Sequence, residues 1–303
     1  NSLKPGGVLG TVVFEDINID RGTYSLNVGG GSYDSEISWE ISGTGIAGNI
    51  DPSINPASLA FINPYLSMSG NTWYADLSGS KSTCLWKSQN TSRYISIESL
   101  GIDDIEYHID NTVEPIGYVE AQWIAFDFGS NIDLNKLFNN SRDYFIGYNI
   151  KLNYSKLHTT RYWGYTFDLG LNKKINDKYS VGIVMKDFGK EYLGNQTINI
   201  NNSFGLGTSY TTSLLNKNNF FMNLQVLFDY INYENNDTYK LAFKAGFPYV
   251  NLMVGSSYSS KKYQDFSYGI SIQYKTWMII FGSLVHENPA LGTPTSFEIR
   301  KFF

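Results

Sequence analysis

Residues 144–154 read YFIGYNIKLNY, and every second side chain in this stretch is large and apolar. The apolar set is Tyr144, Ile146, Tyr148, Ile150, Leu152 and Tyr154, and the polar or small set between them is Gly147, Asn149, Lys151 and Asn153. Successive side chains of a β-strand point to opposite faces of the sheet. The stretch therefore predicts a strand with one face in an apolar medium and the other in a polar one.

The same alternation recurs along the rest of the chain, which indicates an antiparallel meander. Further examples are YTFDLGL (165–171), YSVGIVM (179–185), FFMNLQVLFDY (220–230), YKLAFKAGF (239–247), FSYGISIQY (266–274) and WMIIFGSLV (277–285). Turn sequences rich in Asn, Asp, Lys and Ser separate them, such as NKKINDK (172–178) and ENNDT (234–238). Counting these segments and the less regular ones gives about 14 strands, with an uncertainty of two. An even number such as 14 is typical of single-chain bacterial barrels.

The composition bears on the medium that the apolar faces meet. Aromatic residues make up 16% of the chain, with 23 Tyr, 19 Phe and 6 Trp, whereas charged residues make up 17%, against about 25% in a typical soluble domain. Mean hydropathy is nonetheless negative, at -0.25, and no run reaches the roughly 20 apolar residues of a membrane helix. Aromatic residues gather at strand ends, as in the girdles of membrane barrels. We therefore expect an all-β, transmembrane antiparallel barrel; a soluble β-sandwich or propeller is the alternative.

Charge and cysteine usage exclude some classes of function. The net charge of -5 and a pI near 5.3 argue against nucleic acid as a partner. The single cysteine, Cys84, excludes an intrachain disulfide. The start of the chain, NSLKPGGV, lacks a basic region followed by an apolar run, so the sequence is either cytoplasmic or a mature chain after signal-peptide removal.

The chain divides into two parts by composition. Residues 1–45 are glycine-rich and alternate weakly, and we expect an N-terminal extension that acts as a plug, a tail or a partner-binding segment. Residues 46–303 form the predicted barrel. Within it, GIDDIEYHIDNTVEPIG (101–117) and GKEYLGNQTININ (189–201) break the alternation, so we expect long polar loops there.

INPASLAF (54–61) is the most motif-like short stretch. Asn55, Pro56 and Ala57 are candidate signature residues for a rigid turn that carries the chain into or across the barrel mouth, and an ordinary Asn-Pro turn before a strand is the alternative. The histidines 108, 158 and 286 lie far apart in the sequence and match no zinc motif, and no GxSxG sequence is present. We predict no catalytic, cofactor-binding or metal-binding residues.

The chain ends TSFEIRKFF (295–303), which again alternates. Phe297, Ile299 and Phe303 form one apolar row, so we expect a final strand that closes the barrel against the first, with Phe303 as the residue read by the barrel-assembly machinery. Lys301 interrupts the row and is expected near a membrane interface, where its ammonium reaches water.

Three stretches resemble the FadL-like outer-membrane barrels and, within them, the PorV and PorQ branch. They are GTGIAGNIDPSINPASLAF (43–61), TFDLGLNKKINDKYSVGIVMKDFG (166–189) and ALGTPTSFEIRKFF (290–303). The resemblance implies a 14-stranded barrel in the bacterial outer membrane. FadL-type members move hydrophobic molecules through the barrel and out sideways, whereas PorV-type members serve as docking or shuttle partners in type IX secretion.

These expectations lead to a non-enzymatic barrel that acts as an anchor, docking platform or secretion-associated subunit for other envelope or surface proteins. A FadL-like transporter of small hydrophobic molecules is the alternative, and a soluble β-rich adhesion domain is the third hypothesis. The expected partners are outer-membrane lipid, the barrel-assembly machinery during folding, and other envelope or secreted proteins. We expect no cofactor.

Overall fold

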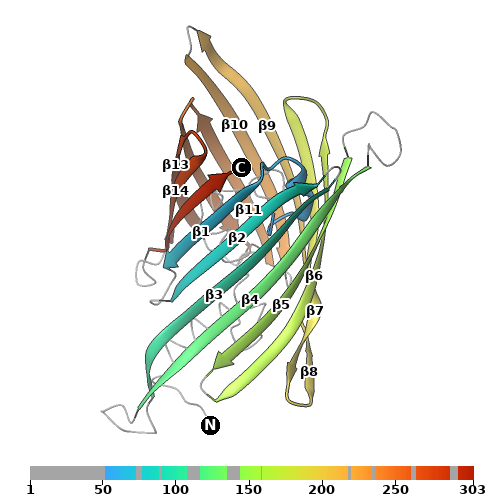
Figure 1. Cartoon of the computed structure of the whole chain (residues 1–303), viewed down its shortest axis with the longest axis vertical. Helices are drawn as coiled ribbons and strands as arrows, with labels where there is room; N and C mark the ends of the chain where they lie inside the picture. The colour runs from blue at the N-terminus through green and yellow to red at the C-terminus, as the bar shows by residue number, and fades with distance from the viewer. Residues whose placement is uncertain are drawn as a thin grey trace.

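The protein is a closed antiparallel β-barrel in a computed structural model (Figure 1). The structure describes residues 52–303 apart from 73–76, 89–90, 108–116, 135–143, 158, 218–219, 234–235, 261–263 and 287–292. The boundary expected at residue 45, and the N-terminal extension before it, lie outside the described residues. Each strand pairs with its neighbour in the chain, and β15 pairs with β1 to complete the ring.

The wall is built from strands of very different lengths. In chain order they are β1 (Tyr65–Thr72), β2 (Ser78–Ser88), β3 (Thr91–Tyr107), β4 (Gly117–Asp133), β5 (Tyr144–Leu157), β6 (Thr160–Lys174), β7 (Tyr179–Leu193), β8 (Gln196–Asn199), β9 (Ser203–Lys217), β10 (Phe220–Tyr233), β11 (Asn236–Gly246), β12 (Val250–Ser259), β13 (Gln264–Tyr274), β14 (Trp277–His286) and β15 (Thr295–Phe302). Strands β3 and β4 have 17 residues, whereas β1 and β15 have 8. One side of the barrel is therefore taller than the other, as Figure 1 shows.

Strands β8 and β9 are two parts of one wall strand. Both pair with β7 in the same register, β8 along Lys190–Leu193 and β9 along Tyr179–Lys186. The ring thus has 14 strands, and the predicted fold class and strand number are confirmed.

Two predicted loops are strand in the structure. Residues 101–107 belong to β3, whose register with β4 shifts between Ile102 and Ile105. This irregularity breaks the period of two, which is why the sequence reads as a loop. Residues 189–201 continue β7 to Leu193, turn at Gly194 with φ +56° and return as β8. The expectation of long loops at 101–117 and 189–201 was wrong for these residues.

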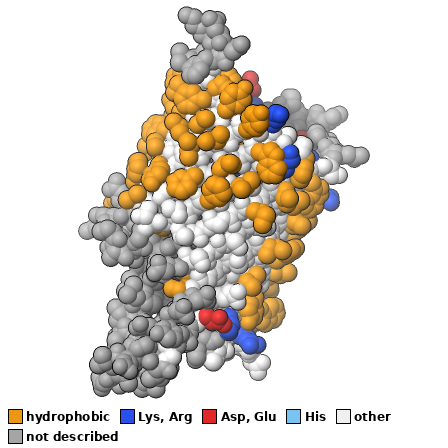
Figure 2. All heavy atoms as spheres, turned by 60° about the vertical axis from the view of Figure 1, so that its left-hand side comes forward, with side chains coloured by type: hydrophobic (Ala, Val, Ile, Leu, Met, Phe, Trp, Pro, Cys, Tyr) orange, Lys and Arg blue, Asp and Glu red, His pale blue; other side chains and the backbone are white. Residues whose placement is uncertain are grey.

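The outer surface of the wall is apolar, as a lipid-facing surface must be. Along β5, Ile146, Ile150 and Leu152 are 37%, 41% and 54% exposed, whereas Asn149 and Lys151 are buried on the inner side. Figure 2 shows hydrophobic side chains gathered over the upper part of one face and down one edge of the molecule. Strands of about 9–11 residues suffice to cross a membrane, so the short strands β11–β15 match the hydrocarbon thickness and the long ones extend past it.

Aromatic pairs mark both ends of this apolar band. Tyr179 of β7 lies 4.7 Å from Tyr210 of β9 between ring centroids, and Trp163 of β6 stacks on Tyr192 of β7 at 4.3 Å near the opposite end of the wall. The amphipathic rings of Tyr and Trp favour the membrane–water interface. The arrangement agrees with the girdles expected from the sequence.

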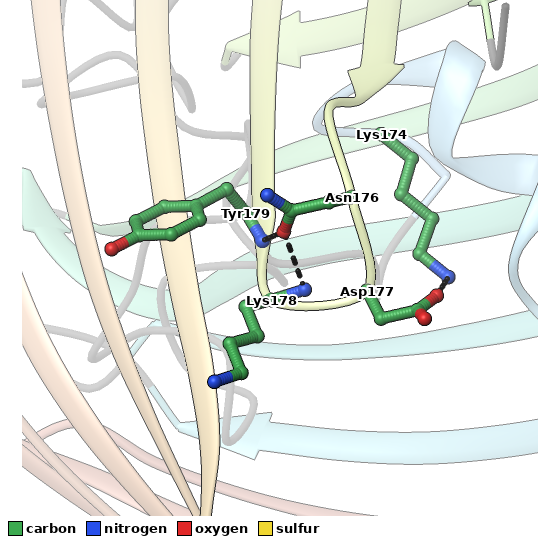
Figure 3. Close-up of polar contacts among 5 residues, drawn as sticks. All are labelled: Lys174, Asn176, Asp177, Lys178 and Tyr179. Carbon is green, nitrogen blue, oxygen red and sulfur yellow. Dashed lines mark hydrogen bonds and ion pairs between the residues drawn. The ribbon is translucent and has the colours of Figure 1, made fainter.

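The β6–β7 turn is fixed by its own polar side chains (Figure 3). The Asn176 Oδ1 atom accepts hydrogen bonds from the backbone N–H groups of Lys178 and Tyr179, at 2.8 and 2.9 Å. The Lys174 ammonium forms an ion pair with Asp177 at 3.1 Å. An Asn side chain that binds the backbone two residues ahead is a recurrent turn device, and here it helps to set the register between β6 and β7, the two strands that the turn joins.

Both described chain ends of the wall lie at one mouth, called here the terminal mouth. Tyr65 is paired with Phe302, and the Phe303 N–H donates to the Pro64 carbonyl at 3.2 Å. The last strand is therefore held on both edges, by β1 and β14. Among the described residues, no helix has the length and hydropathy required to cross a membrane.

Replacing Ile150 by arginine tests the lipid-facing surface. Ile150 lies between Tyr144 and Tyr154 on β5, so a guanidinium there meets hydrocarbon, and we expect a loss of about 2–4 kcal/mol in the free energy of unfolding. The control is Gln122→Arg, an exposed outward position next to Lys156, beyond the aromatic residues of β5. Urea titration of the barrel refolded into lipid vesicles measures both variants. Equal, small effects of the two would contradict the assignment of the lipid face.

Candidate functional site

A short segment folds into the barrel lumen just before the first strand. Residues 52–62, called here the plug segment, are buried except for Ala60 and Phe61, which are half-buried. The 3₁₀ helix η4 (Pro56–Ala60) lies at its centre and packs against β4, β5 and β6. Asn55 caps this helix, because its Oδ1 atom accepts from the Ala57 N–H at 3.0 Å. Pro56 suits the first helical position, where no N–H is needed.

Two glycines of the wall form the seat of the plug segment. Gly147 of β5 and Gly170 of β6 are directly paired and face the lumen. A Cβ atom on Gly147 would lie 2.1 Å from the Pro56 carbonyl carbon, and one on Gly170 would lie 2.0 Å from the Asn55 Oδ1 atom. Any side chain at either position would displace the helix. The close approach of η4 to the wall therefore depends on these glycines.

The plug segment makes an apolar and a polar contact on either side of its seat. Ile54 packs with Val184 of β7 and Ile231 of β10, while the Lys81 Nζ atom of β2 donates to the Ser53 Oγ atom at 3.4 Å. Leu59 and Ile62 belong to a second apolar cluster, at the terminal mouth, with Tyr65, Leu85 and Tyr94. The segment thus contacts much of the circumference of the barrel at this level.

Charged side chains cover the inner face of β2–β7 and β15. The buried acidic residues are Glu98, Asp127, Asp168, Asp187, Glu191, Asp229 and Glu298, and the buried basic residues are Lys81, Lys151, Lys186 and Arg300. They follow the strand register in two adjacent rows: Glu298–Ser69–Lys81–Glu98 and Arg300–Ser67–Thr83–Ser96–Asp127–Lys151. This side of the lumen is polar and carries all of these charges except Asp229 of β10, with two more buried acidic than basic residues.

Several hydrogen bonds hold these charges in place. The Arg300 guanidinium makes two hydrogen bonds to the Glu298 carboxylate, at 2.6 and 3.1 Å. Ser96 Oγ donates to Asp127 Oδ2 at 3.1 Å, and Asn149 Nδ2 donates to Asp168 Oδ2 at 3.1 Å. Charges removed from water are tolerated when they are paired and hydrogen-bonded. The network rigidifies the polar half of the wall.

The opposite side of the lumen is lined by apolar and small residues. Leu227 of β10, Ala242 of β11, Met253 of β12 and Ile280 of β14 are each at most 2% exposed, and Leu284 is 8% exposed. In the register of these strands, glycines and serines lie between them: Gly255, Ser267, Gly269, Ser271 and Gly282. The lumen therefore has a strongly charged half and a half in which apolar and small residues dominate, with Asp229, Lys240 and Lys244 of β10 and β11 as charged exceptions.

The wall is interrupted beside the plug segment. Ladder pairing of β7 with the β8–β9 strand stops after Lys186 and resumes at Lys190. The Ile200 N–H still donates to the Gly189 carbonyl at 3.2 Å, so the interruption is confined to Asp187 and Phe188. Here Asp187 adopts a left-handed backbone with φ 66°, and its N–H donates to Asp168 Oδ1 at 2.8 Å. On the other edge of β7, the register with β6 shifts between Phe167 and Leu169. The bulge kinks β7 next to Val184, the residue that contacts Ile54.

The structure brings together some of the residues singled out in the sequence and separates others. Asn55, Pro56 and Ala57 lie in the lumen, on the glycine seat, in a helix rather than a simple turn. Phe297 and Ile299 face outward on β15, 48% and 39% exposed, and Phe303 is 75% exposed. They lie on the wall, away from the plug segment.

Lys301 lies in the aromatic zone of the terminal mouth. Its ammonium is 4.9 Å from the Trp277 ring centroid and hydrogen-bonds to the Thr276 hydroxyl. This is where a lysine reaches water from a lipid-facing strand at little cost.

The described residues offer no arrangement suited to a metal ion. Among them, no group of three or more His, Cys, Asp or Glu side chains is placed to hold a metal. His108 and His158 lie outside the described residues, and His286 is at the end of β14. The site consists of a plug, an amphipathic lumen and a wall interruption.

The fold is similar to that of two aromatic-hydrocarbon transporters. The Ralstonia pickettii toluene transporter TbuX aligns with 89% of this chain and 97% of its own, with a TM-score of 0.56 and 10% identity. The Pseudomonas putida toluene transporter TodX aligns with 88% and 95%, with a TM-score of 0.58 and 10% identity. At this identity the likeness shows the fold, which agrees with the FadL-like barrel expected from the sequence. No protein-family model and no curated protein sequence matches the chain.

Replacing Gly147 by alanine tests the seat of the plug. The added methyl group overlaps the Pro56 backbone, so we expect the plug segment to leave its seat while the wall still folds. Gly70→Ala on β1 is the matched control, because a Cβ there meets no atom within 4 Å. A cysteine at Ala60, in a Cys84→Ser background, should react with a water-soluble maleimide at least about tenfold faster in the Gly147→Ala variant. Unchanged labelling with an intact barrel would show that the glycine does not hold the plug.

Proposed function

We propose that this protein is a non-enzymatic outer-membrane barrel that lets small hydrophobic molecules pass from its lumen through the wall. The observation that carries the proposal is the position of the wall interruption. It is bordered by Asp187 and Phe188 on one strand and by Asn201 and Asn202 on the other, because Gly189 and Ile200 are already hydrogen-bonded. Val184 and Ile231, which contact Ile54 of the plug segment, lie beside it. The half of the lumen in which apolar and small residues dominate leads to the same place.

Moving an apolar solute through a polar lumen costs free energy. The cost arises because the apolar surface of the solute contacts water or charged groups instead of other apolar groups. On β12–β14, the apolar and small side chains Met253, Gly255, Gly269, Ile280 and Gly282 offer an alternative to the charged half. An exit through the wall delivers the solute into hydrocarbon, so it never returns to water. The two toluene transporters with a similar fold support this choice of solute.

Closing the interruption with a disulfide tests the proposal. Because the register of β7 with β8 and β9 is the same on both sides of the gap, Phe188 should face Asn201. In a Cys84→Ser background, cells carrying Phe188→Cys with Asn201→Cys should take up radiolabelled toluene at a rate reduced by about fivefold or more when oxidised. Reduction should restore the rate.

The matched control is Val181→Cys with Thr208→Cys, a directly paired position in the regular part of the same ladder. Its oxidation should leave uptake unchanged. Full uptake through the cross-linked interruption would contradict exit by this route. Equal uptake by cells with and without the protein would contradict transport altogether.

A docking role is the second candidate, and the height of the wall favours it. Strands β3–β7 have 14–17 residues, beyond the roughly 9–11 that a membrane requires. The excess gives a rigid rim away from the terminal mouth, where envelope or secreted proteins could bind as in the PorV and PorQ branch. Affinity purification after cross-linking from intact envelopes tests this. Recovery of a stoichiometric protein partner supports docking, whereas recovery of this chain alone contradicts it.

A further inference from the structure

We propose that the lumen holds a binding site for the hydroxyl group of a small, otherwise apolar solute, formed by Trp123, Asn153 and Ser155. The inference rests on the proposed transport function and narrows its substrate class. The three residues lie on β4 and β5, on the lumen side of the wall and toward the mouth opposite the termini.

The strand register places the three side chains together. Trp123 of β4 and Ser155 of β5 are directly opposite each other, and side chains so paired have Cβ atoms about 4.5–5.5 Å apart. Asn153 is two residues from Ser155 and therefore lies on the same face of β5. The three residues are 5%, 6% and 5% exposed. The site is thus inside the barrel and shielded from lipid.

Each of the three residues has a buried polar atom without a hydrogen bond. In the part of the chain that the structure describes, no hydrogen bond is made by three of their atoms: Trp123 Nε1, Ser155 Oγ and Asn153 Oδ1. A buried polar group left unpaired loses its hydrogen bonds to water without replacement, so such groups are usually satisfied. Three of them on adjacent positions form a set that a bound molecule would satisfy together.

The neighbouring residues fix the orientation of these atoms. The Asn153 Nδ2 atom donates to the Glu191 Oε1 atom at 2.9 Å, which fixes the amide with its oxygen directed elsewhere. Gly164, paired with Asn153, lets Glu191 approach the wall closely, since a Cβ there would lie 2.8 Å from Glu191 Cγ and 3.0 Å from Asn153 Oδ1. The orientation of the Asn153 amide is therefore fixed by residues of the barrel strands.

The donor and acceptor set selects the chemistry of the ligand. The indole N–H only donates, the amide oxygen only accepts, and the serine hydroxyl does either. A ligand hydroxyl accepts from the indole and donates to the amide, so it matches both. A carboxylate could not donate to Asn153, and it would enter a lumen with more buried acidic than basic residues. An ammonium could not accept from the indole.

Apolar residues lie beside the three polar atoms on β3 and β4, while the Lys151 ammonium is 5.9 Å from the Trp123 ring centroid and Glu191 is hydrogen-bonded to Asn153. Leu100 is paired with Trp123, and Ala121 and Ala125 lie two residues to either side of it on the same face; all three are buried. The remainder of the ligand would meet these side chains. An aromatic alcohol such as benzyl alcohol meets both requirements, whereas toluene meets only the apolar one.

Binding of benzyl alcohol and toluene to the purified full-length barrel in detergent tests the site. Calorimetry should show benzyl alcohol binding that weakens about five- to tenfold in Trp123→Phe and in Ser155→Ala, because one hydrogen bond is worth roughly 1 kcal/mol. Toluene binding should change less than twofold. The control is Ser80→Ala, which removes an exposed serine bonded to Ser99 at 3.0 Å and should alter neither.

The outcomes separate this inference from the proposed function. If the wild type binds benzyl alcohol and toluene equally and the variants change neither affinity, the three polar atoms bind no ligand hydroxyl and the inference is wrong. That result leaves toluene uptake by cells untouched. If uptake of both solutes fails while the variants still weaken benzyl alcohol binding, the site is real and the transport function is wrong. Heat-modifiable migration of each variant on a gel confirms that the barrel has folded.

Discussion

The pairing of β15 with β1 is the interaction on which the rest of the structure depends. A sheet in hydrocarbon cannot leave an edge, because each unpaired backbone group costs several kcal/mol there. Eight consecutive residue pairs, from Tyr65–Phe302 to Thr72–Thr295, close the ring. Closure divides the molecule into an outer face that meets lipid and an inner face that is hidden from it. Every later feature is a way of filling that inner face.

The inner face is filled differently on its two halves. On β2–β7 and β15, charges alternate along rows set by the register, and paired groups such as Arg300 and Glu298 lower the cost of burial. On β10–β14, small and apolar residues dominate. The plug segment joins the halves, with Asn55 against Gly170 and Ile54 against Ile231. The kink at Asp187 lies where the halves meet, which gives the wall interruption an apolar side.

The sequence predicts the wall well and the lumen poorly, for a physical reason. Alternation within one strand identifies its two faces, and Ile150 and Lys151 lie on the outer and inner faces as expected. A bulge interrupts the alternation of apolar and polar residues. For this reason the residues of β3 after Ile102 were expected to be a loop. The plug seat requires Gly147 and Gly170 to be opposite each other. That pairing depends on the register between strands, which the pattern of a single strand does not contain.

The central claim is that residues 52–62 plug a lipid-embedded barrel, and a nitroxide scan in bilayers measures this most directly. Spin labels are placed one at a time along β5 and at Ala60, and collision rates with oxygen and with a water-soluble nickel complex are recorded. The account predicts oxygen accessibility with a period of two along β5, highest at Ile150, and low accessibility to both reagents at Ala60. A label at Ala60 that collides freely with the nickel complex, or a β5 without the period, would contradict it.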